Sequence, residues 1–353
     1  MVRGTLKNIR HLTLSELEQY FEIIGEKKFR TKQVWEWLWQ KGAQSFADMT
    51  NLSKELRQKL SENFSFPSLT VSATQYSSDG TIKFGFRTHE GHLCEGVLIP
   101  TENRYTACVS SQIGCSLSCK FCATGYIERK RNLDFDEIYD EVQLINQQCE
   151  NTYGKKLSNI VFMGMGEPLL NYKNVLRSIE RITAADGLAM SPRRIIVSTA
   201  GVAKQIKQLG DDKVKFKLAL SLHAPNDAKR NQIMPINESN NLKSLIEALN
   251  YFYKETKNEI TLEYILFNNF NDSHKDADEL IKLYRQVPAD LVNIIEYNPI
   301  EFAQFSKPTE ERMTDFMNYL EKHKVNARLR RSRGKDIDAA CGQLANKTPL
   351  HIP

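Results

Sequence analysis

Hydrophobic and polar positions follow three different patterns along the chain, and each pattern predicts a different kind of structure. In residues 1–66 the apolar residues recur every three or four positions, as on one face of an amphipathic helix. We expect a first helix in LSELEQYFEIIG, capped by Ser15 and ending at Gly25, a second over residues 31–39 and a third over residues 53–62. This region therefore predicts a small N-terminal helical domain.

Residues 67–101 change to an alternating pattern, which is typical of strands. The expected strands are residues 69–74, 81–87 and 92–99, and Ser78-Asp-Gly supplies a turn between the first two. They predict a short antiparallel β extension. Glu95 is the lone acid in the mostly apolar run LCEGVLIP, so its carboxylate is either exposed at a sheet edge or buried for a functional reason.

From residue 102 to residue 345, strand and helix patterns alternate. The strand candidates are residues 105–110, 159–165, 194–198, 216–222, 259–266 and 291–297, and the helix candidates are residues 134–150, 172–186, 201–209, 240–255, 274–286 and 308–323. Six β/α repeats predict an α/β fold with a parallel sheet and outer helices, and six are too few to close an eight-fold barrel. We expect an open, partial (β/α)6 barrel that binds ligands at the C-terminal ends of its strands, followed by a tail at residues 346–353.

The composition narrows the class of protein without identifying it. A chain of 353 residues that is 41% hydrophobic can bury one large core, and its net charge of +5 is compatible with a polyanionic partner. The chain has no run of eighteen apolar residues and begins without a signal peptide's apolar centre. Seven cysteines, an odd number, argue against a disulfide framework and for a reduced cytoplasm. Nothing in the pattern requires more than a monomer.

Three of the cysteines form one compact motif, Cys115-Ser-Leu-Ser-Cys119-Lys-Phe-Cys122. Cubane iron–sulfur clusters and structural zinc sites both normally take four protein ligands. Three thiolates therefore predict a [4Fe-4S] cluster with one iron open to another ligand, and a zinc site completed by Cys108 is the alternative. The spacing resembles that of the radical S-adenosylmethionine (SAM) superfamily, whose fourth iron binds the amino and carboxylate groups of SAM.

Polar residues also stand where later strands are expected to end. In MGMGEP, small residues let the backbone approach a ligand and a carboxylate can accept hydrogen bonds from an ammonium group. Gly166 and Glu167 resemble the radical SAM motif for the amino group of SAM. The other strand ends carry Ser198, Ser221, Leu222, His223 and Asn298. Each alone would be a cap or turn residue, but together they predict a shared pocket, which in this superfamily holds SAM.

A further cysteine, Cys341, stands in RGKDIDAACGQL, after the cationic run 328–335. A lone cysteine is usually a buried, inert thiol. Neighbouring cations would instead favour the nucleophilic thiolate, and Gly342 leaves room for a large substrate beside the sulfur. The cationic run and residues 129–131 are also natural contacts for phosphate groups.

With this segment the resemblance becomes closer. CVSSQIGCSLSCKFCATG, FMGMGEPL, SLHAPND, EYNP and RGKDIDAACGQL together, in this order, resemble the RlmN family. Its members are dual-specificity methyltransferases of adenine C2 in 23S ribosomal RNA (rRNA), near the peptidyl-transferase centre, and in transfer RNA (tRNA), next to the anticodon. The related Cfr type methylates C8 of the same rRNA adenosine. Glu167-Pro168, where the Cfr type is expected to have Glu-Ala, favours C2.

The resemblance implies a reaction that uses two SAM molecules per turnover. Cys341 would take a methyl group from the first, because the electron-poor C2 carbon cannot attack a SAM methyl group itself. A 5′-deoxyadenosyl radical from the second would remove a hydrogen atom from that methyl group, and the resulting methylene radical would add to C2. Cys108 would promote proton loss from C2 and then attack the Cys341 sulfur, giving a transient disulfide. Glu95 matches a candidate proton acceptor of the family.

The cluster motif alone is compatible with two other classes of protein. A radical activase or an iron–sulfur electron-transfer protein would share the cluster, but neither needs Cys341 and Cys108. An RNA substrate must unstack the adenine, and a low-potential electron donor must supply the cluster. The basic N-terminal domain would read RNA shape, with Trp35 and Trp39 in its core rather than stacked on bases. We expect removal of residues 1–66 to abolish RNA methylation and to leave methylation of Cys341 intact.

Overall fold

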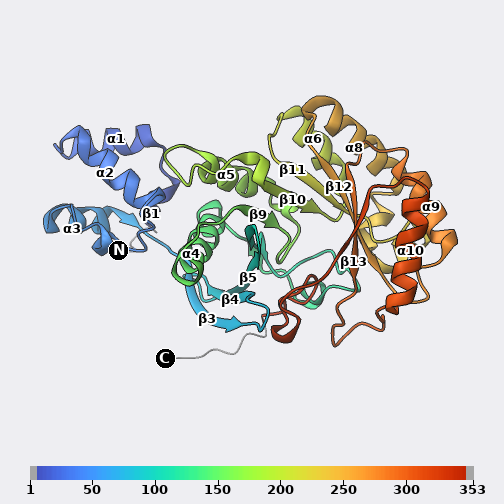
Figure 1. Ribbon diagram of the computed structural model, residues 1–353. Helices are drawn as coiled ribbons and strands as arrows, with labels where there is room; N and C mark the ends of the chain where they lie inside the picture. The colour runs from blue at the N-terminus through green and yellow to red at the C-terminus, as the bar shows by residue number, and fades with distance from the viewer. Residues whose placement is uncertain (1–5, 347–353) are drawn as a thin grey trace.

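The computed structural model describes residues 6–346 and is built around a ten-stranded sheet (Figure 1). The strands lie in the order β14-β13-β12-β11-β10-β9-β6-β5-β4-β3. Their bounds are β3 Thr70–Tyr76, β4 Ile82–Arg87, β5 Leu93–Thr101, β6 Arg104–Cys108, β9 Asn159–Phe162, β10 Ile195–Thr199, β11 Lys217–Ser221, β12 Ile260–Leu266, β13 Leu291–Glu296 and β14 Ala327–Arg330. The predicted tail, apart from Asn346, lies outside the described residues.

The sheet joins the β extension and the barrel into one layer. Neighbouring strands from β3 to β6 are antiparallel, and those from β6 to β14 are parallel. The first and last strands of the order, β3 and β14, are both open edges, so the barrel does not close. The prediction of an open, partial α/β barrel is therefore confirmed.

Helices connect the parallel strands and lie on the outside of the sheet (Figure 1). They are α4 Phe135–Tyr153, α5 Tyr172–Thr183, α6 Ala203–Asp211, α7 Asp227–Ile233, α8 Leu242–Thr256, α9 His274–Tyr284 and α10 Glu310–Lys322, and the sequence analysis missed only the short α7 among them. Local signals fix their ends. A capping box of Asp134 and Glu137 begins α4, and Gly154 ends it in the left-handed conformation.

One parallel strand was not predicted. Strand β14 pairs with β13 from Val292 opposite Ala327 to Ile295 opposite Arg330, and so it adds a seventh parallel strand to the expected six. The sequence instead predicts only that residues 328–335 form a cationic run. A strand of four residues at a sheet edge leaves too short an alternation to stand out among arginines.

The N-terminal domain contains the three predicted helices, α1 Leu14–Ile23, α2 Lys28–Trp39 and α3 Lys54–Asn63. The short strands β1 (Lys7–Asn8) and β2 (Phe64–Ser65) pair at its base, and β7 (Gln112–Ile113) pairs with β8 (Arg131–Asn132) beside the barrel. The prediction that Ser15 caps α1 was wrong. Thr13 is the cap, because its hydroxyl accepts from the Glu16 N–H at 3.2 Å and the Glu16 carboxylate accepts from the Thr13 N–H at 2.7 Å.

The N-terminal domain shares its core with helix α4. Trp39 is 1% exposed, and its ring lies 5.2 Å from that of Tyr139 and 5.9 Å from that of Phe135. Trp35 is also buried, which confirms that both tryptophans are core residues. Its indole N–H donates to Asp186 at 2.7 Å, beyond the end of α5. The domain is therefore tied to the barrel by aromatic packing and by polar contacts.

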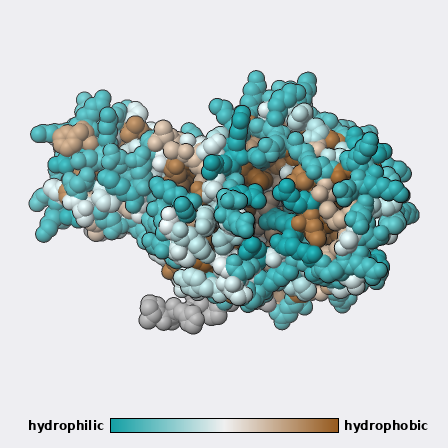
Figure 2. Space-filling model, viewed as in Figure 1, coloured by the Kyte–Doolittle hydropathy of each residue, from teal (hydrophilic) through white to brown (hydrophobic). Residues whose placement is uncertain are grey.

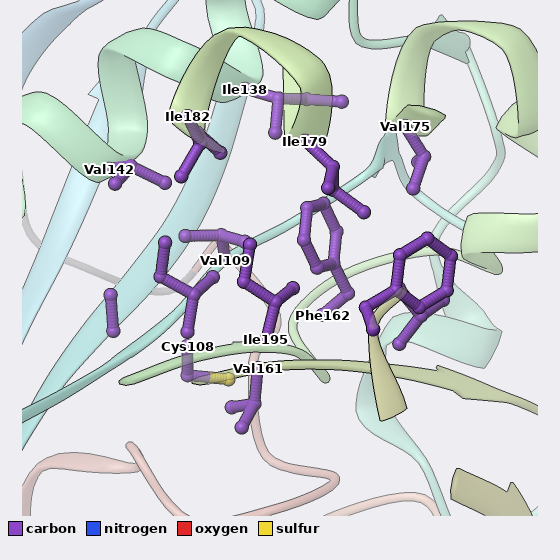
Figure 3. Packing of buried hydrophobic residues seen from close by; sticks show 14 of the residues in the cluster. Cys108, Val109, Ile138, Val142, Val161, Phe162, Val175, Ile179, Ile182 and Ile195 are labelled. Carbon is purple, nitrogen blue, oxygen red and sulfur yellow. The ribbon is translucent and has the colours of Figure 1, made fainter. Parts of the chain in front are cut away.

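The same hydrophobic core continues between the sheet and its outer helices (Figure 3). Phe162 of β9, Ile195 of β10 and Val109, which directly follows β6, pack with Ile138 of α4 and Ile179 of α5. This packing fixes the position of the strands from which the loops of the site emerge. None of the helices within residues 6–346 combines the length and apolar character that crossing a lipid bilayer requires.

Candidate active site

The three motif cysteines lie in the loop after β6, and all three line one pocket at the C-terminal ends of the strands. Burial raises the pKa of Cys115 to about 11, and it also raises the pKa of Cys122 above its ordinary value. Such thiols ionise readily only beside a strong positive charge, which a bound metal centre supplies.

The distances between the cysteine sulfur atoms distinguish a zinc site from an iron–sulfur cluster. Within residues 6–346, no cysteine belongs to a set of three His, Cys, Asp or Glu ligand atoms that all lie within 4.8 Å of one another. A tetrahedral zinc ion would hold its sulfur ligands about 3.8 Å apart. Cys108, the proposed fourth zinc ligand, is not among the pocket-lining residues either. The donor set therefore fits a larger cluster with three thiolate ligands, and the zinc alternative loses its support.

The pocket is a recess in an otherwise mostly hydrophilic surface. It has about 880 Å³ of empty space, its open mouth included, which suits a nucleoside-sized ligand. Figure 2 shows hydrophobic residues in the recess over the barrel strands. The predicted site residues that line it are Cys115, Cys119, Cys122, Gly166, Glu167, Ser198, Ser221, His223 and Cys341.

Gly166 and Glu167 are held by a close contact with strand β7. Gly166 has a φ of +91°, and a Cβ atom there would lie 2.5 Å from the Cβ of Gln112. The side-chain oxygen Oε1 of Gln112 accepts from the Glu167 N–H at 2.8 Å. The Glu167 carboxylate accepts from the N–H groups of Ala200 at 2.7 Å and Leu169 at 3.0 Å. Burial raises the pKa of Glu167, so a cationic ligand in the pocket would favour its ionised form.

The next two strand ends supply polar groups with fixed orientation. The hydroxyls of Ser198 and Ser221 lie 3.4 Å apart. His223 has a φ of 54°, and its Nδ1 accepts from the Ile265 N–H at 3.1 Å, which leaves Nε2 as the protonated nitrogen. Burial lowers the pKa of His223 to about 3, so the ring is neutral. Phe121 of the cysteine loop packs edge-on against it, with ring centroids 4.8 Å apart.

Two predicted residues approach the site differently. Leu222 is fully buried in the core and does not line the pocket, so only its backbone remains near the strand end. Its carbonyl accepts from Arg230 Nε at 3.1 Å, and the same guanidinium donates to the Ala200 carbonyl. Arg230, which the sequence analysis did not single out, therefore fixes two strand ends at once. Asn298 is also outside the pocket lining, and its amide donates to the Cys341 carbonyl at 3.2 Å.

The segment around Cys341 folds back onto the cysteine loop. The Ala123 N–H donates to the Gly342 carbonyl at 2.7 Å, and the Thr124 hydroxyl donates to the Leu344 carbonyl at 2.7 Å. Gly342 has a φ of +85°, and a Cβ atom there would lie 3.2 Å from the Phe121 carbonyl. The tail cysteine, 219 positions after Cys122 in the chain, is thus brought to the wall of the same pocket.

Cys108 lies at the end of β6, buried beneath the pocket wall, where it pairs with Val161 of β9. Burial raises its pKa to about 12, and a negative charge on Cys341 would raise it further. The positive charge of Arg330 instead lowers the pKa of Cys108. Its guanidinium lines the pocket, donates to the Met163 sulfur at 3.7 Å and faces both cysteines.

Glu263 is a second pocket residue that the sequence analysis missed. It is 4% exposed and lies 3.7 Å from Arg330 Nη1 through Oε2, while its Oε1 accepts from the Asn293 amide at 2.8 Å. The sequence held a signal, because Glu263 is the lone acid in the apolar strand ITLEYIL. The same signal drew attention to Glu95.

Glu95 is buried rather than exposed at an edge, which settles that alternative. It is 1% exposed on β5, and its carboxylate pairs with the equally buried Lys83 at 3.0 Å. Its other oxygen accepts from the Ala345 N–H at 2.9 Å. Glu95 does not line the pocket, so its visible contacts anchor the segment that follows Cys341.

Several expected phosphate contacts are engaged within the protein. Arg131 forms ion pairs with Glu90 and Glu137, at 2.6 Å each. Arg331 binds Glu310 through both terminal nitrogens, and Lys335 pairs with Glu296. The cationic run is therefore not one free basic surface. Charge counting along the sequence missed this because the partners come from other strands and helices.

Comparisons with known proteins agree with this site. Residues 109–281 match the "Radical SAM superfamily", and residues 7–65 match the "Ribosomal RNA large subunit methyltransferase N-terminal domain". The solved structure of a radical SAM methyltransferase from Sphaerobacter thermophilus is 38% identical, covers 97% of this chain and 100% of its own, and superposes with a TM-score of 0.91. The open barrel and its cysteine loop thus define a radical SAM protein.

Relatives narrow the class to one family. A "Probable dual-specificity RNA methyltransferase RlmN" of Cytophaga hutchinsonii is 57% identical over 97% of this chain and 93% of its own. A protein with the same description from Flavobacterium psychrophilum is 53% identical over 97% of this chain and 98% of its own. The chain belongs to the RlmN family. A [4Fe-4S] cluster and SAM are the cofactors of its superfamily, and the cysteine loop fits the cluster.

Proposed function

We propose that this enzyme methylates C2 of an adenosine in 23S rRNA and in tRNA, as the dual specificity of its relatives indicates. The observation that carries the proposal is the position of Cys341. It lines the same pocket as the three cysteines of the loop, although it comes from the other end of the chain. A radical activase or an electron-transfer protein has no need of a thiol at that position.

The cofactor sites follow from the pocket residues. Cys115, Cys119 and Cys122 would hold a [4Fe-4S] cluster, and the cluster with SAM supplies an adenosyl radical that removes hydrogen atoms. Glu167 and the backbone at Gly166 would receive the amino group of SAM. The other SAM contacts are proposed at Ser198, Ser221, Leu222, His223 and Asn298, with Leu222 contributing backbone only.

The two remaining cysteines would carry the methyl group and release the product. Cys341 takes a methyl group from one SAM and presents it in the pocket, so that each turnover consumes two SAM molecules. Once the methylene carbon is bonded to C2, the adduct passes its unpaired electron to a one-electron acceptor, and Cys108 assists loss of the C2 proton, which leaves a closed-shell adduct. The Cys108 sulfur then bonds to the Cys341 sulfur and frees the methylated base. Glu95, held by Lys83 and Ala345, would support the Cys341 segment rather than serve as the proton acceptor.

The partners follow from the reaction. An electron donor of low potential supplies the cluster, a thiol reductant reopens the disulfide, and the enzyme acts as a cytoplasmic monomer. Residues 1–66 would recognise RNA, residues 67–101 would extend the sheet, and residues 102–345 would carry the chemistry.

Mass spectrometry of RNA tests the proposal. Reconstituted enzyme is incubated with SAM, a reductant and either 23S rRNA fragments or tRNA, and the digested nucleosides are separated. We expect 2-methyladenosine from both RNAs and one extra methyl group on Cys341 in the intact protein. The product 8-methyladenosine would show Cfr-type chemistry instead, and unmodified RNA together with unmethylated Cys341 would contradict the proposal.

A further inference from the structure

The proposed reaction leaves one pair of charged pocket residues without a task. Arg330 and Glu263 line the pocket beside Cys341, and neither belongs to the cysteine loop or to the predicted SAM contacts. Burying a carboxylate such as that of Glu263 in a mostly apolar recess is costly unless the charge is compensated. Glu263 Oε2 has no hydrogen-bond partner, and it lies 3.7 Å from Arg330 Nη1. The pair is thus an ion pair without tight hydrogen bonding.

Arg330 lies where it can act on the cysteine chemistry. The side chain of Met163 accepts from Arg330 Nη1 at 3.7 Å, and Met163 directly follows β9, whose Val161 pairs with Cys108 of β6. Arg330 is the last residue of β14, where it pairs with Ile295 of β13. The guanidinium therefore lies against the strand end that neighbours Cys108, and it lines the same pocket as Cys341.

We propose that Arg330, held in place by Glu263, is the positive charge that stabilises the Cys108 thiolate when Cys108 resolves the methylene adduct on Cys341. This inference rests on the proposed function and assigns the pair a part in it. In this role Arg330 is an electrostatic partner of the reacting sulfurs, and Glu263 is a positioning residue that acts through Arg330.

The step needs such a charge. An electron pair of the Cys108 thiolate forms the new sulfur–sulfur bond, and the bond between the Cys341 sulfur and the methylene carbon breaks. The pair from that bond goes to carbon, which takes up a proton and becomes the methyl group of the base. The disulfide is later reduced with two electrons from a dithiol. A protonated Cys108 can perform neither the proton transfer from C2 nor the attack on sulfur.

Some groups around Cys108 favour its ionisation, and others oppose it. Burial, the charge of Cys341 and the carboxylate of Glu141 raise its pKa, while Arg330 and the Met163 N–H lower it. Glu141 lies behind the strand, where it accepts from the Ser110 N–H at 2.8 Å. Among the described residues that act on Cys108, Arg330 is thus the cation that offsets these effects.

Single-turnover kinetics of adduct resolution test the proposal. Holoenzyme with methylated Cys341 is mixed with the RNA, SAM and reductant, and the covalent protein–RNA adduct is followed on denaturing gels from pH 6.5 to pH 9. We expect R330Q to accumulate adduct and to resolve it about tenfold more slowly at neutral pH, the change in thiolate population that one pKa unit brings. Raising the pH by about one unit should bring the rate of R330Q up to the rate of wild type at neutral pH, because thiolate population rises about tenfold per pH unit below the pKa. C108A should accumulate adduct at every pH, because it has no thiol to ionise.

Two further variants keep the test decisive. R330K preserves the charge and should resolve the adduct within about threefold of wild type. E263Q retains Arg330 but loses its counter-charge, and it should slow resolution in the same direction by a smaller factor. If R330Q loses its iron, E263Q and R330K decide the question. Wild-type resolution rates and pH profiles in R330Q, or in E263Q where R330Q cannot be prepared, would overturn the role of the pair. The proposed function is judged separately, by whether the wild-type enzyme makes 2-methyladenosine in the same assay.

Discussion

Two regions of the molecule bury charge, and they do so in opposite ways. At the junction of the N-terminal domain and α4, Arg10 is 1% exposed and lies 3.1 Å from Asp136 and 2.5 Å from Asp140. In the pocket, Glu263 lies 3.7 Å from Arg330, and the Arg330 side chain remains 32% exposed. Ion pairs of the first kind, shut away from solvent, hold domains together. Charges that line an open pocket, as Glu263 and Arg330 do, are available to a ligand or a reaction.

The strongest test of the pocket removes Cys341, the proposed methyl carrier. Cys341→Ser should abolish RNA methylation and the extra methyl group on the intact protein, because serine oxygen is far less nucleophilic than a thiolate. The three cluster cysteines are unchanged, so the iron content and the charge-transfer absorption of the cluster should match those of wild type. Residual 2-methyladenosine above the no-enzyme background would show that the methyl group takes another route.

The strongest test of the junction removes its buried cation. Arg10→Gln should lower the free energy of unfolding by about 3–5 kcal/mol, because Asp136 and Asp140 are left without their counter-charge. Chemical denaturation measures this. Lys7→Gln, which removes an exposed ion pair with Glu16, is the matched control and should leave the unfolding midpoint unchanged. Equal midpoints for the two variants would mean that the junction is not held by charge.

Sequence reasoning succeeded where a signal was local. The barrel elements, the cysteine loop and Gly166-Glu167 each depend on spacing within a few residues, and the structure places them as predicted. It failed where the partners are distant in the chain. Glu263 and Arg330 meet across β13, and nothing in the order of residues indicates that two non-adjacent strands bring them together.

The junction also affects how a prediction about the N-terminal domain can be tested. We expected that deleting residues 1–66 would spare methylation of Cys341. The deletion would remove Arg10 and Trp39 and expose Phe135 and Tyr139, which now pack against the tryptophan. Such a loss would destabilise α4 and the barrel together, so the truncated chain cannot isolate the role of the domain. Surface substitutions are needed instead.

Glu141 offers a milder test of a buried charge near the pocket. Burial raises its pKa to about 8, above the ordinary value of a glutamate, so the folded state binds a proton that the unfolded state releases. Its stability contribution is therefore unfavourable above pH 4.5 and grows as the pH rises towards 8. Glu141→Gln should raise the unfolding free energy by about 1–3 kcal/mol at pH 8 and by less at pH 5. Thermal unfolding at both pH values checks this, and a gain that is larger at pH 5 would contradict the buried acid.

The smallest expected effects concern the outer surface of the N-terminal domain. Its charged side chains neither form buried ion pairs nor belong to the pocket. Lys27, Lys28 and Lys32 are exposed on and beside α2, whereas Lys41 pairs with Glu36 at 3.2 Å. If the three lysines contact phosphates, replacing them with glutamine should weaken RNA binding without changing methylation of Cys341. Each lost contact should lower the slope of log affinity against log salt by about one. Lys41→Gln is the control, and a triple variant with the wild-type salt slope would place the RNA on another face.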